Sequence, residues 1–102
     1  MEGSNRILVY GHIGQRPELR YTGKGEAVCN FSVAENIEGA ETPRWLKVVV
    51  WGKEAELCTA QLDKGLPVFV KGRNVDCEFK TKEGNLKKYT ELRADRVGIS
   101  IA

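Results

Sequence analysis

The stretch "RWLKVVVWGKEAELCTAQLDKG" (Arg44–Gly65) joins a β-branched run to a segment with a different repeat. Side chains of a strand alternate between two faces, so Trp45, Lys47, Val49 and Trp51 share one face. The opposite face is an ordinary aliphatic core face, made of Leu46, Val48 and Val50. An ammonium group without a partner is costly to bury. The tryptophan face is therefore either a partly exposed surface or a second core with Lys47 at its rim.

The second half of this stretch changes period. Ala55, Cys58 and Leu62 fall at i, i+3 and i+7, which indicates one face of a helix. Gly65 stands where a glycine often ends a helix, so we expect it at the C-cap. The stretch thus predicts a strand followed directly by a short helix.

Strands are predicted on both sides of this stretch. Apolar or alternating runs cover residues 6–14, 27–35, 66–80 and 86–99, and "TKEGN" joins the last two as a hairpin. Five strands with a helix between the third and fourth is the chain order of an OB-fold barrel. We therefore predict one all-β domain over residues 1–102, a five-stranded Greek-key barrel with one short helix between strands 3 and 4. A small β-sandwich and an SH3-like barrel are the alternatives. The predicted core residues are Phe31, Val33, Leu57, Leu62 and Phe69.

Charge is unevenly distributed along the 102 residues, although the formal net charge is only +2. Residues 1–51 are neutral, whereas Lys71–Lys88 holds six basic and three acidic side chains. A basic cluster of this size is often only a solvated face. It becomes informative where a fold would place it beside a binding surface.

Several classes of protein are disfavoured. Cys29, Cys58 and Cys77 form no CxxC pair, and one histidine, His12, gives zinc too few nitrogen ligands. We expect reduced thiols, no metal, no cofactor and, without a nucleophile–base–orienter set, no enzyme. Neither a signal peptide nor an apolar run near ~20 residues is present, so no membrane partner is expected. The expected location is cytoplasmic and nucleoid-associated, with organellar, phage and plasmid origins left open.

An OB-fold barrel binds oligonucleotides with the face of strands 2 and 3 and with the loops joining strands 1–2 and 4–5. The Trp45–Lys47–Trp51 stripe lies on predicted strand 3, and the basic cluster, with Phe79 and Tyr89, lies on the 4–5 hairpin. Aromatic faces stack on unpaired bases of any identity, and lysines follow phosphates. These features predict sequence-tolerant binding to single strands, because a duplex hides its bases.

The sequence also resembles the bacterial and mitochondrial single-stranded DNA-binding proteins over nearly its whole length. The "RPELRYT" turn and the "VVVWGK" strand end are the most specific pieces. The resemblance implies protection of single strands in DNA replication, recombination and repair, with Trp45, Trp51 and Phe79 as stacking residues. Tyr89 is displaced by one position from the family's hairpin aromatic, so it faces either the site or the opposite side. The full predicted nucleic-acid site comprises Arg20, Trp45, Lys47, Trp51, Lys53, Lys64, Arg73, Phe79, Lys80, Lys82, Lys87, Lys88 and Tyr89.

Assembly and partners are also predicted. The apolar first strand, "RILVYGHI", is a candidate free edge of the kind that pairs with another copy. We expect a homotetramer, with a homodimer as the alternative, because joined copies hold one strand with greater avidity. The family's acidic C-terminal tail is absent from the sequence, so we expect replication or repair proteins not to be recruited through it. An adaptor similar to primosomal replication protein N and an RNA-binding OB module remain alternative functions.

Overall fold

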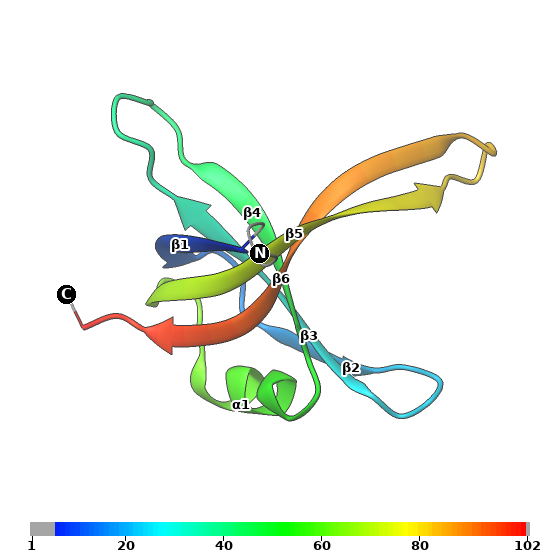
Figure 1. Ribbon diagram of the computed structural model, residues 1–102, viewed down its shortest axis with the longest axis horizontal. Helices are drawn as coiled ribbons and strands as arrows, with labels where there is room; N and C mark the ends of the chain where they lie inside the picture. The colour runs from blue at the N-terminus through cyan, green and yellow to red at the C-terminus, as the bar shows by residue number, and fades with distance from the viewer. Residues whose placement is uncertain (1–5, 102) are drawn as a thin grey trace.

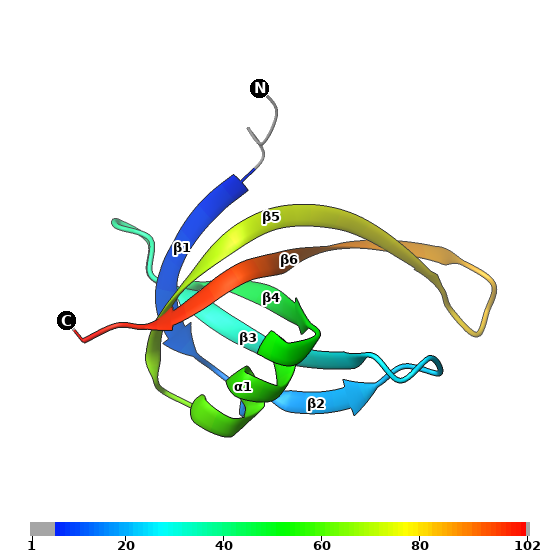
Figure 2. The same ribbon diagram turned by 60° about the horizontal axis from the view of Figure 1, so that its bottom comes forward.

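The computed structural model describes residues 6–101, which form a closed β-barrel with one helix at its side (Figures 1 and 2). In chain order the elements are β1 (Arg6–Ile13), β2 (Glu18–Tyr21), β3 (Ala27–Glu35), β4 (Arg44–Trp51), α1 (Lys53–Gln61), β5 (Pro67–Lys80) and β6 (Leu86–Ile99). The predicted OB-fold class is confirmed, including the single short helix before the long C-terminal hairpin.

The strands follow the order β1-β5-β6-β4-β3-β2, and a short β1–β3 pairing closes the ring. That pairing joins His12 to Ala34 and Ile13 to Val33. The β4–β6 pairing is parallel, and all other pairings are antiparallel. Figure 2 shows the result as two facing layers, β1–β5–β6 and β2–β3–β4.

The strand count of five was wrong, because the sequence analysis missed β2. This strand has only four residues, "ELRY", and pairs along Ala27–Asn30 of β3. Four residues, two of them charged, are too few to show the alternation of apolar and polar side chains that is typical of a strand. Consequently, this pairing depends on the adjacent strand rather than on a local signal.

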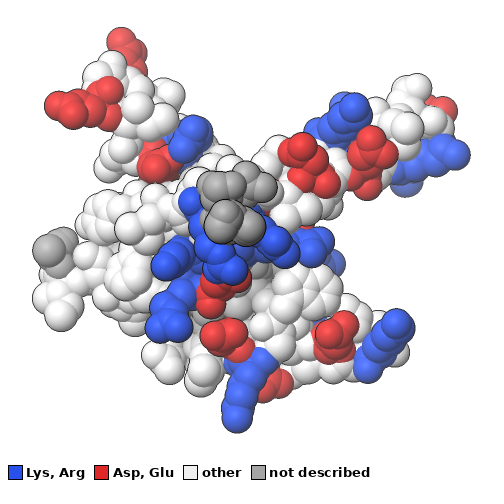
Figure 3. Space-filling model, in the orientation of Figure 1, with Lys and Arg blue, Asp and Glu red and all other residues white. Residues whose placement is uncertain are grey.

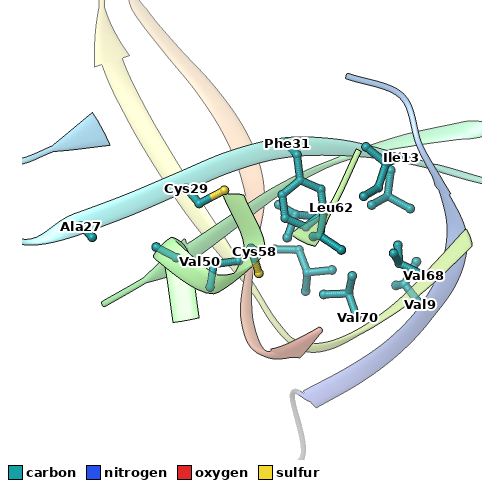
Figure 4. Packing of buried hydrophobic residues seen from close by; sticks show 14 residues of the cluster. Val9, Ile13, Ala27, Cys29, Phe31, Val50, Cys58, Leu62, Val68 and Val70 are labelled. Atoms are coloured by element: carbon teal, nitrogen blue, oxygen red, sulfur yellow. The ribbon is translucent and has the colours of Figure 1, made fainter. Parts of the chain in front are cut away.

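The core lies between the two layers and is built mainly from small aliphatic side chains (Figure 4). The predicted inward residues Phe31, Val33 and Leu62 are buried, but Leu57 and Phe69 are 51% and 38% exposed. Those two predictions were wrong for simple geometric reasons. Leu57 lies outside the Ala55/Cys58/Leu62 face of the helix, and Phe69 alternates with the buried Val68 and Val70 on β5.

Helix α1 packs against β2, β3 and β4. Gly52 leads into it with a positive φ of 76°, a conformation that side chains other than glycine rarely adopt. The predicted C-cap at Gly65 was wrong. The cap residue is Leu62, whose N–H donates to the Cys58 carbonyl, and Gly65 lies in the following turn. Within residues 6–101 no helix is long and apolar enough to cross a membrane.

The β5–β6 hairpin continues well past the barrel (Figure 1). The two strands pair from Val68–Ile99 to Lys80–Leu86, with a register shift at Lys71/Gly72. No residue of β5 after Gly72 is fully buried. We call residues 74–91 the arm, and it reaches over the outer face of β3 and β4.

Candidate nucleic-acid interface

The outer face of β4 carries Trp45 and Trp51, for which the sequence left open an exposed surface or a second core. Trp45 and Trp51 are 59% and 40% exposed, and Lys47 between them is also exposed. Val49, which shares their side, is buried. The tryptophans therefore form an open surface and not a second core, and no ammonium group has to be desolvated. We call β3 and β4 with this outer face the platform.

The position of the Trp45 ring depends on a glycine. A Cβ atom added to Gly14, just after β1, would overlap the ring atoms Cζ3 and Cη2 of Trp45 and crowd the Ser32 hydroxyl. The ring thus packs directly against backbone without a side chain, which only glycine provides. This contact fixes the orientation of a large side chain that is otherwise mostly open to solvent.

Polar residues of β3 complete the platform. Asn30 pairs with Val49 and Ser32 with Lys47 in the β3–β4 register, so these side chains share the outer face. Both β3 residues are partly exposed. The platform therefore presents aromatic rings at its two ends and hydrogen-bonding groups between them.

The arm carries two more aromatic rings, and Tyr89 is the one that faces the platform. The ring centroids of Phe79 and Tyr89 lie 5.8 Å apart with the planes tilted by 59°. Lys47 Nζ lies 4.8 Å from the centroid of the Tyr89 ring. Tyr89 thus faces the predicted site, which resolves the two orientations left open by the sequence.

The surroundings of the Tyr89 phenol favour its neutral form. A hydrogen bond with the Cys77 thiol, its cross-strand partner, raises the pKa of the Tyr89 phenol above its usual value. A phenol already favours its neutral form at physiological pH, and this shift strengthens that preference. No negative charge therefore develops on the aromatic cover of the platform.

The platform, the arm, the neighbouring Arg93 and residues 15–20 together line a groove of about 920 Å³. Five predicted site residues line it: Arg20, Trp45, Lys47, Trp51 and Tyr89. The groove also includes residues that the sequence analysis missed: Gln15, Arg16, Glu18, Asn30, Ser32, Cys77, Glu91 and Arg93. Its four basic side chains outnumber its two acidic ones, so the local charge favours an anionic ligand.

Glu91 is the acidic residue at the root of the arm, and it is only 9% exposed. Arg93 Nε donates a hydrogen bond to Glu91 Oε2 at 3.3 Å. The pair satisfies a carboxylate that would otherwise be costly to bury. It also holds the Arg93 guanidinium at the edge of the groove.

The remaining predicted residues lie outside the groove lining. Phe79 and Lys87 are register partners and share the Tyr89 side of the arm, whereas Lys80 and Lys88 alternate to its other side. Lys82 lies in the hairpin turn. Lys53 begins α1, Lys64 lies in the turn after α1, and Arg73 is on the outer side of β5.

The missed residues carried recognisable signals. Asn30 and Ser32 are the polar side of an alternating strand, and Glu91 and Arg93 continue the Tyr89 side of β6 at spacing two. Arg16 lies in a turn whose direction the sequence does not specify. Local alternation could thus have identified four of these residues but not which surfaces face each other.

Several known proteins with similar sequences have the same description. The model of the Single-strand binding protein family matches residues 4–100. The chain is 37% identical over 108 residues to the single-stranded DNA-binding protein of Corynebacterium glutamicum, covering 97% of this chain and 48% of the relative. It is 35% identical over 99 residues to single-stranded DNA-binding protein 1 of Chlorobaculum tepidum, covering 88% and 60%. For the Mycobacterium tuberculosis protein of the same description the values are 34% over 110 residues, 99% and 67%. The chain thus spans about half to two thirds of the length of these relatives.

Proposed function

Because the chain belongs to the single-strand binding protein family, we propose that it binds single-stranded DNA in the groove between the platform and the arm. The observation that carries this proposal is the exposed Trp45–Lys47–Trp51 surface facing Tyr89. Its role would be to protect single strands during DNA replication, recombination and repair. The bacterial relatives support a place beside cytoplasmic DNA.

The proposed binding mode uses stacking and phosphate contacts. Trp45 and Trp51 offer exposed ring faces to unpaired bases, and each such stack is worth about 1–3 kcal/mol. Arg16, Arg20 and Lys47 supply positive charge beside those rings. Because every base has a stacking face, this arrangement selects for single strands without selecting a sequence.

A neutral phenol and a paired carboxylate suit a groove that accepts phosphates. A free buried carboxylate would repel the ligand, but Arg93 offsets the charge of Glu91. The Tyr89 phenol is neutral at physiological pH and adds no second negative charge. We infer that these contacts keep the aromatic cover compatible with a polyanion.

We further propose self-association through β1. Its register with β5 runs from Arg6 to His12, but its pairing with β3 involves only His12 and Ile13. Among residues 6–101, the strand ladder on the second edge of β1 is thus limited to His12 and Ile13, and Leu8 is 67% exposed. Such an edge can pair with a second copy. A homodimer would form directly in this way, and a homotetramer remains the predicted assembly.

A titration tests the binding proposal. We expect oligothymidine to quench tryptophan fluorescence and to bind far more tightly than a duplex of equal length. The logarithm of the affinity should fall with that of the salt concentration by about 0.7 per phosphate contact. A matched oligouridine identifies any preference for RNA. Equal or tighter binding of the duplex at the same salt would overturn the proposal.

A further inference from the structure

A second groove, of about 320 Å³, lies between helix α1 and the C-terminal half of β6. The helix packs on β2, β3 and β4, so the groove remains on the side of the helix that faces β6. Most of the lining is apolar, and it includes Val50, Leu57, Leu62, Val97 and Ile99. We call it the helix groove, to distinguish it from the groove between the platform and the arm.

One edge of β6 is open beside the helix groove. The pairing of this edge with β4 covers only Leu92 and Arg93. From Asp95 to Ile99, no strand of residues 6–101 pairs with it, although the other edge of β6 pairs with β5. An open strand edge presents N–H and C=O groups that can pair with another chain.

The hydrogen bonds to β5 show which backbone groups lie on the open edge. The N–H of Ser100 donates to the carbonyl of Pro67 at 2.9 Å, so these residues form a hydrogen-bonded pair of the antiparallel ladder. Such pairs alternate with pairs whose backbone groups point away from the partner strand. Counting from Ser100, the backbone groups of Val97 and Ile99 therefore point away from β5 and toward the open edge.

The side chains of the same two residues lie on the inner side of β6. Val97 pairs with Val70 and Ile99 with Val68, and both valines of β5 are fully buried. Paired side chains of antiparallel strands share a face, so Val97 and Ile99 lie opposite to the outer face of the β1–β5–β6 layer. Hydrogen-bonding groups and apolar surface thus occur together at this edge.

The wall of the helix groove on α1 carries an acidic side chain. Glu54 lies in the first turn of α1 and forms no ion pair with residues 6–101. On the β6 side, Asp95 already pairs with Arg6, and Arg96 is exposed. Figure 3 shows red acidic atoms over α1 and white, uncharged atoms toward the end of β6. A ligand along the edge should therefore carry a positive charge where it faces α1.

We propose that the helix groove binds an extended peptide segment of a partner protein, which adds to β6 as a further strand. Aliphatic side chains at alternate positions of the segment fill the groove, and a basic side chain on the same face pairs with Glu54. In this mode of recognition, main-chain hydrogen bonds supply affinity and side-chain pockets supply specificity. A second copy of the barrel fits less well, because the open edge is short and α1 forms the opposite wall of the groove.

The helix groove and the proposed DNA groove lie on opposite sides of β4. Val50 lines the first and Trp51 lines the second, and successive side chains of a strand alternate between its faces. A partner is thus held without displacing a bound single strand. The inference goes beyond the proposed function and does not depend on it, because the open edge is present without DNA.

The first test uses the acetylated and amidated peptide KTVTVTK, whose lysines and valines share one face of a strand. We expect the amides of Val97 and Ile99 to exchange quickly with solvent in the free protein and to become protected at saturating peptide, as followed by NMR. No binding at millimolar peptide would overturn the proposal. Protection that rises with protein concentration alone would assign the edge to a second copy instead.

Two N-methylated versions of the peptide test the strand geometry. One is methylated on the threonine nitrogens and the other on the valine nitrogens. The N–H groups of an added strand point alternately toward β6 and away from it. One version should therefore lose binding and the other should keep it. Loss with both, or with neither, would exclude strand addition.

Leu57→Gln tests the apolar wall of the helix groove. We expect this variant to bind the peptide roughly tenfold more weakly, because it removes apolar contact surface. Ile37→Gln is the matched control, since Ile37 is similarly exposed, in the loop between β3 and β4, and lines neither groove. It should bind the peptide as the wild type does, and both variants should bind oligothymidine normally. Equal losses of peptide binding in the two variants would contradict the assignment.

A charge exchange tests the role of Glu54. Wild-type protein should prefer KTVTVTK to ETVTVTE, and Glu54→Lys should reverse that preference at the same ionic strength. An unchanged preference would refute the proposed pairing with a basic ligand. Oligothymidine that displaces the peptide would place the peptide in the DNA groove and overturn the assignment. Wild-type protein that binds the peptide but no oligothymidine would overturn the proposed function and leave the helix groove as a peptide site.

Discussion

The platform and the arm contribute to one groove but are held in very different ways. β4 pairs with β3 along all eight of its residues and with β6 at two, and Val48, Val49 and Val50 are buried beneath it. The arm pairs only within itself, and its β5 half has no fully buried residue. A fixed surface and an adjustable cover thus meet across the Lys47–Tyr89 contact. Stability should reside in the first, and adaptation to the ligand in the second.

The largest difference between the two regions should appear in unfolding. Leu92, in the middle of β6 next to the end of the arm, is 1% exposed and pairs with Val48. We expect Leu92→Ala to lower the free energy of unfolding by about 2–5 kcal/mol, measured by urea titration. Phe79→Ala on the arm should change it by less than about 0.5 kcal/mol. Similar losses in both variants would show that the arm belongs to the cooperative core.

Exposed side chains, which contribute little to the free energy of unfolding, should contribute most to the affinity for DNA. We expect Trp51→Ala to weaken oligothymidine binding by about 1–3 kcal/mol, with little change in the melting temperature, because the ring is exposed. Trp51→Phe is the matched control, since it keeps an aromatic face and should retain most of the affinity. Unfolding of Trp51→Ala by several kcal/mol would instead identify the tryptophan as a core residue.

The arm should contribute less to binding than the platform. Phe79 contacts Tyr89 but does not line the groove. Phe79→Ala is therefore expected to cost about 1 kcal/mol in oligothymidine affinity, at the low end of the range for stacking. Fluorescence titration under the conditions used for Trp51→Ala allows a direct comparison. A larger loss than that of Trp51→Ala would make the arm the dominant binding surface.

The smallest expected effect concerns the contact between the two regions. A cation over an exposed aromatic ring contributes about 0.5–1 kcal/mol. A double-mutant cycle of Lys47→Met and Tyr89→Leu should give a coupling energy of this size in the free protein, measured by urea titration. Coupling indistinguishable from zero would mean that the arm moves independently of the platform.

Local patterns accounted for much of the fold and for the platform. Alternation on β4 predicted which side Trp45 and Trp51 share, and the change to a helical period predicted α1. The errors arose where a position depended on distant strands. β2 exists because β3 offers it an edge, and Phe69 is exposed although its apolar character suggested a core position. Which surfaces face each other across the groove required the register of β5 and β6.

The parallel β4–β6 pairing is only two residue pairs long, Val48–Leu92 and Val49–Arg93, and it joins segments distant in sequence. The β2–β3, β3–β4 and β5–β6 pairs are hairpins, which form in about 1–10 μs in isolation. When the β2–β3–β4 strands dock on the β5–β6 hairpin, a long loop must close, and its entropic cost precedes the stabilising contacts. This step should limit the refolding rate. We therefore expect Leu92→Ala to slow refolding, whereas substitutions at the tip of the arm leave that rate unchanged.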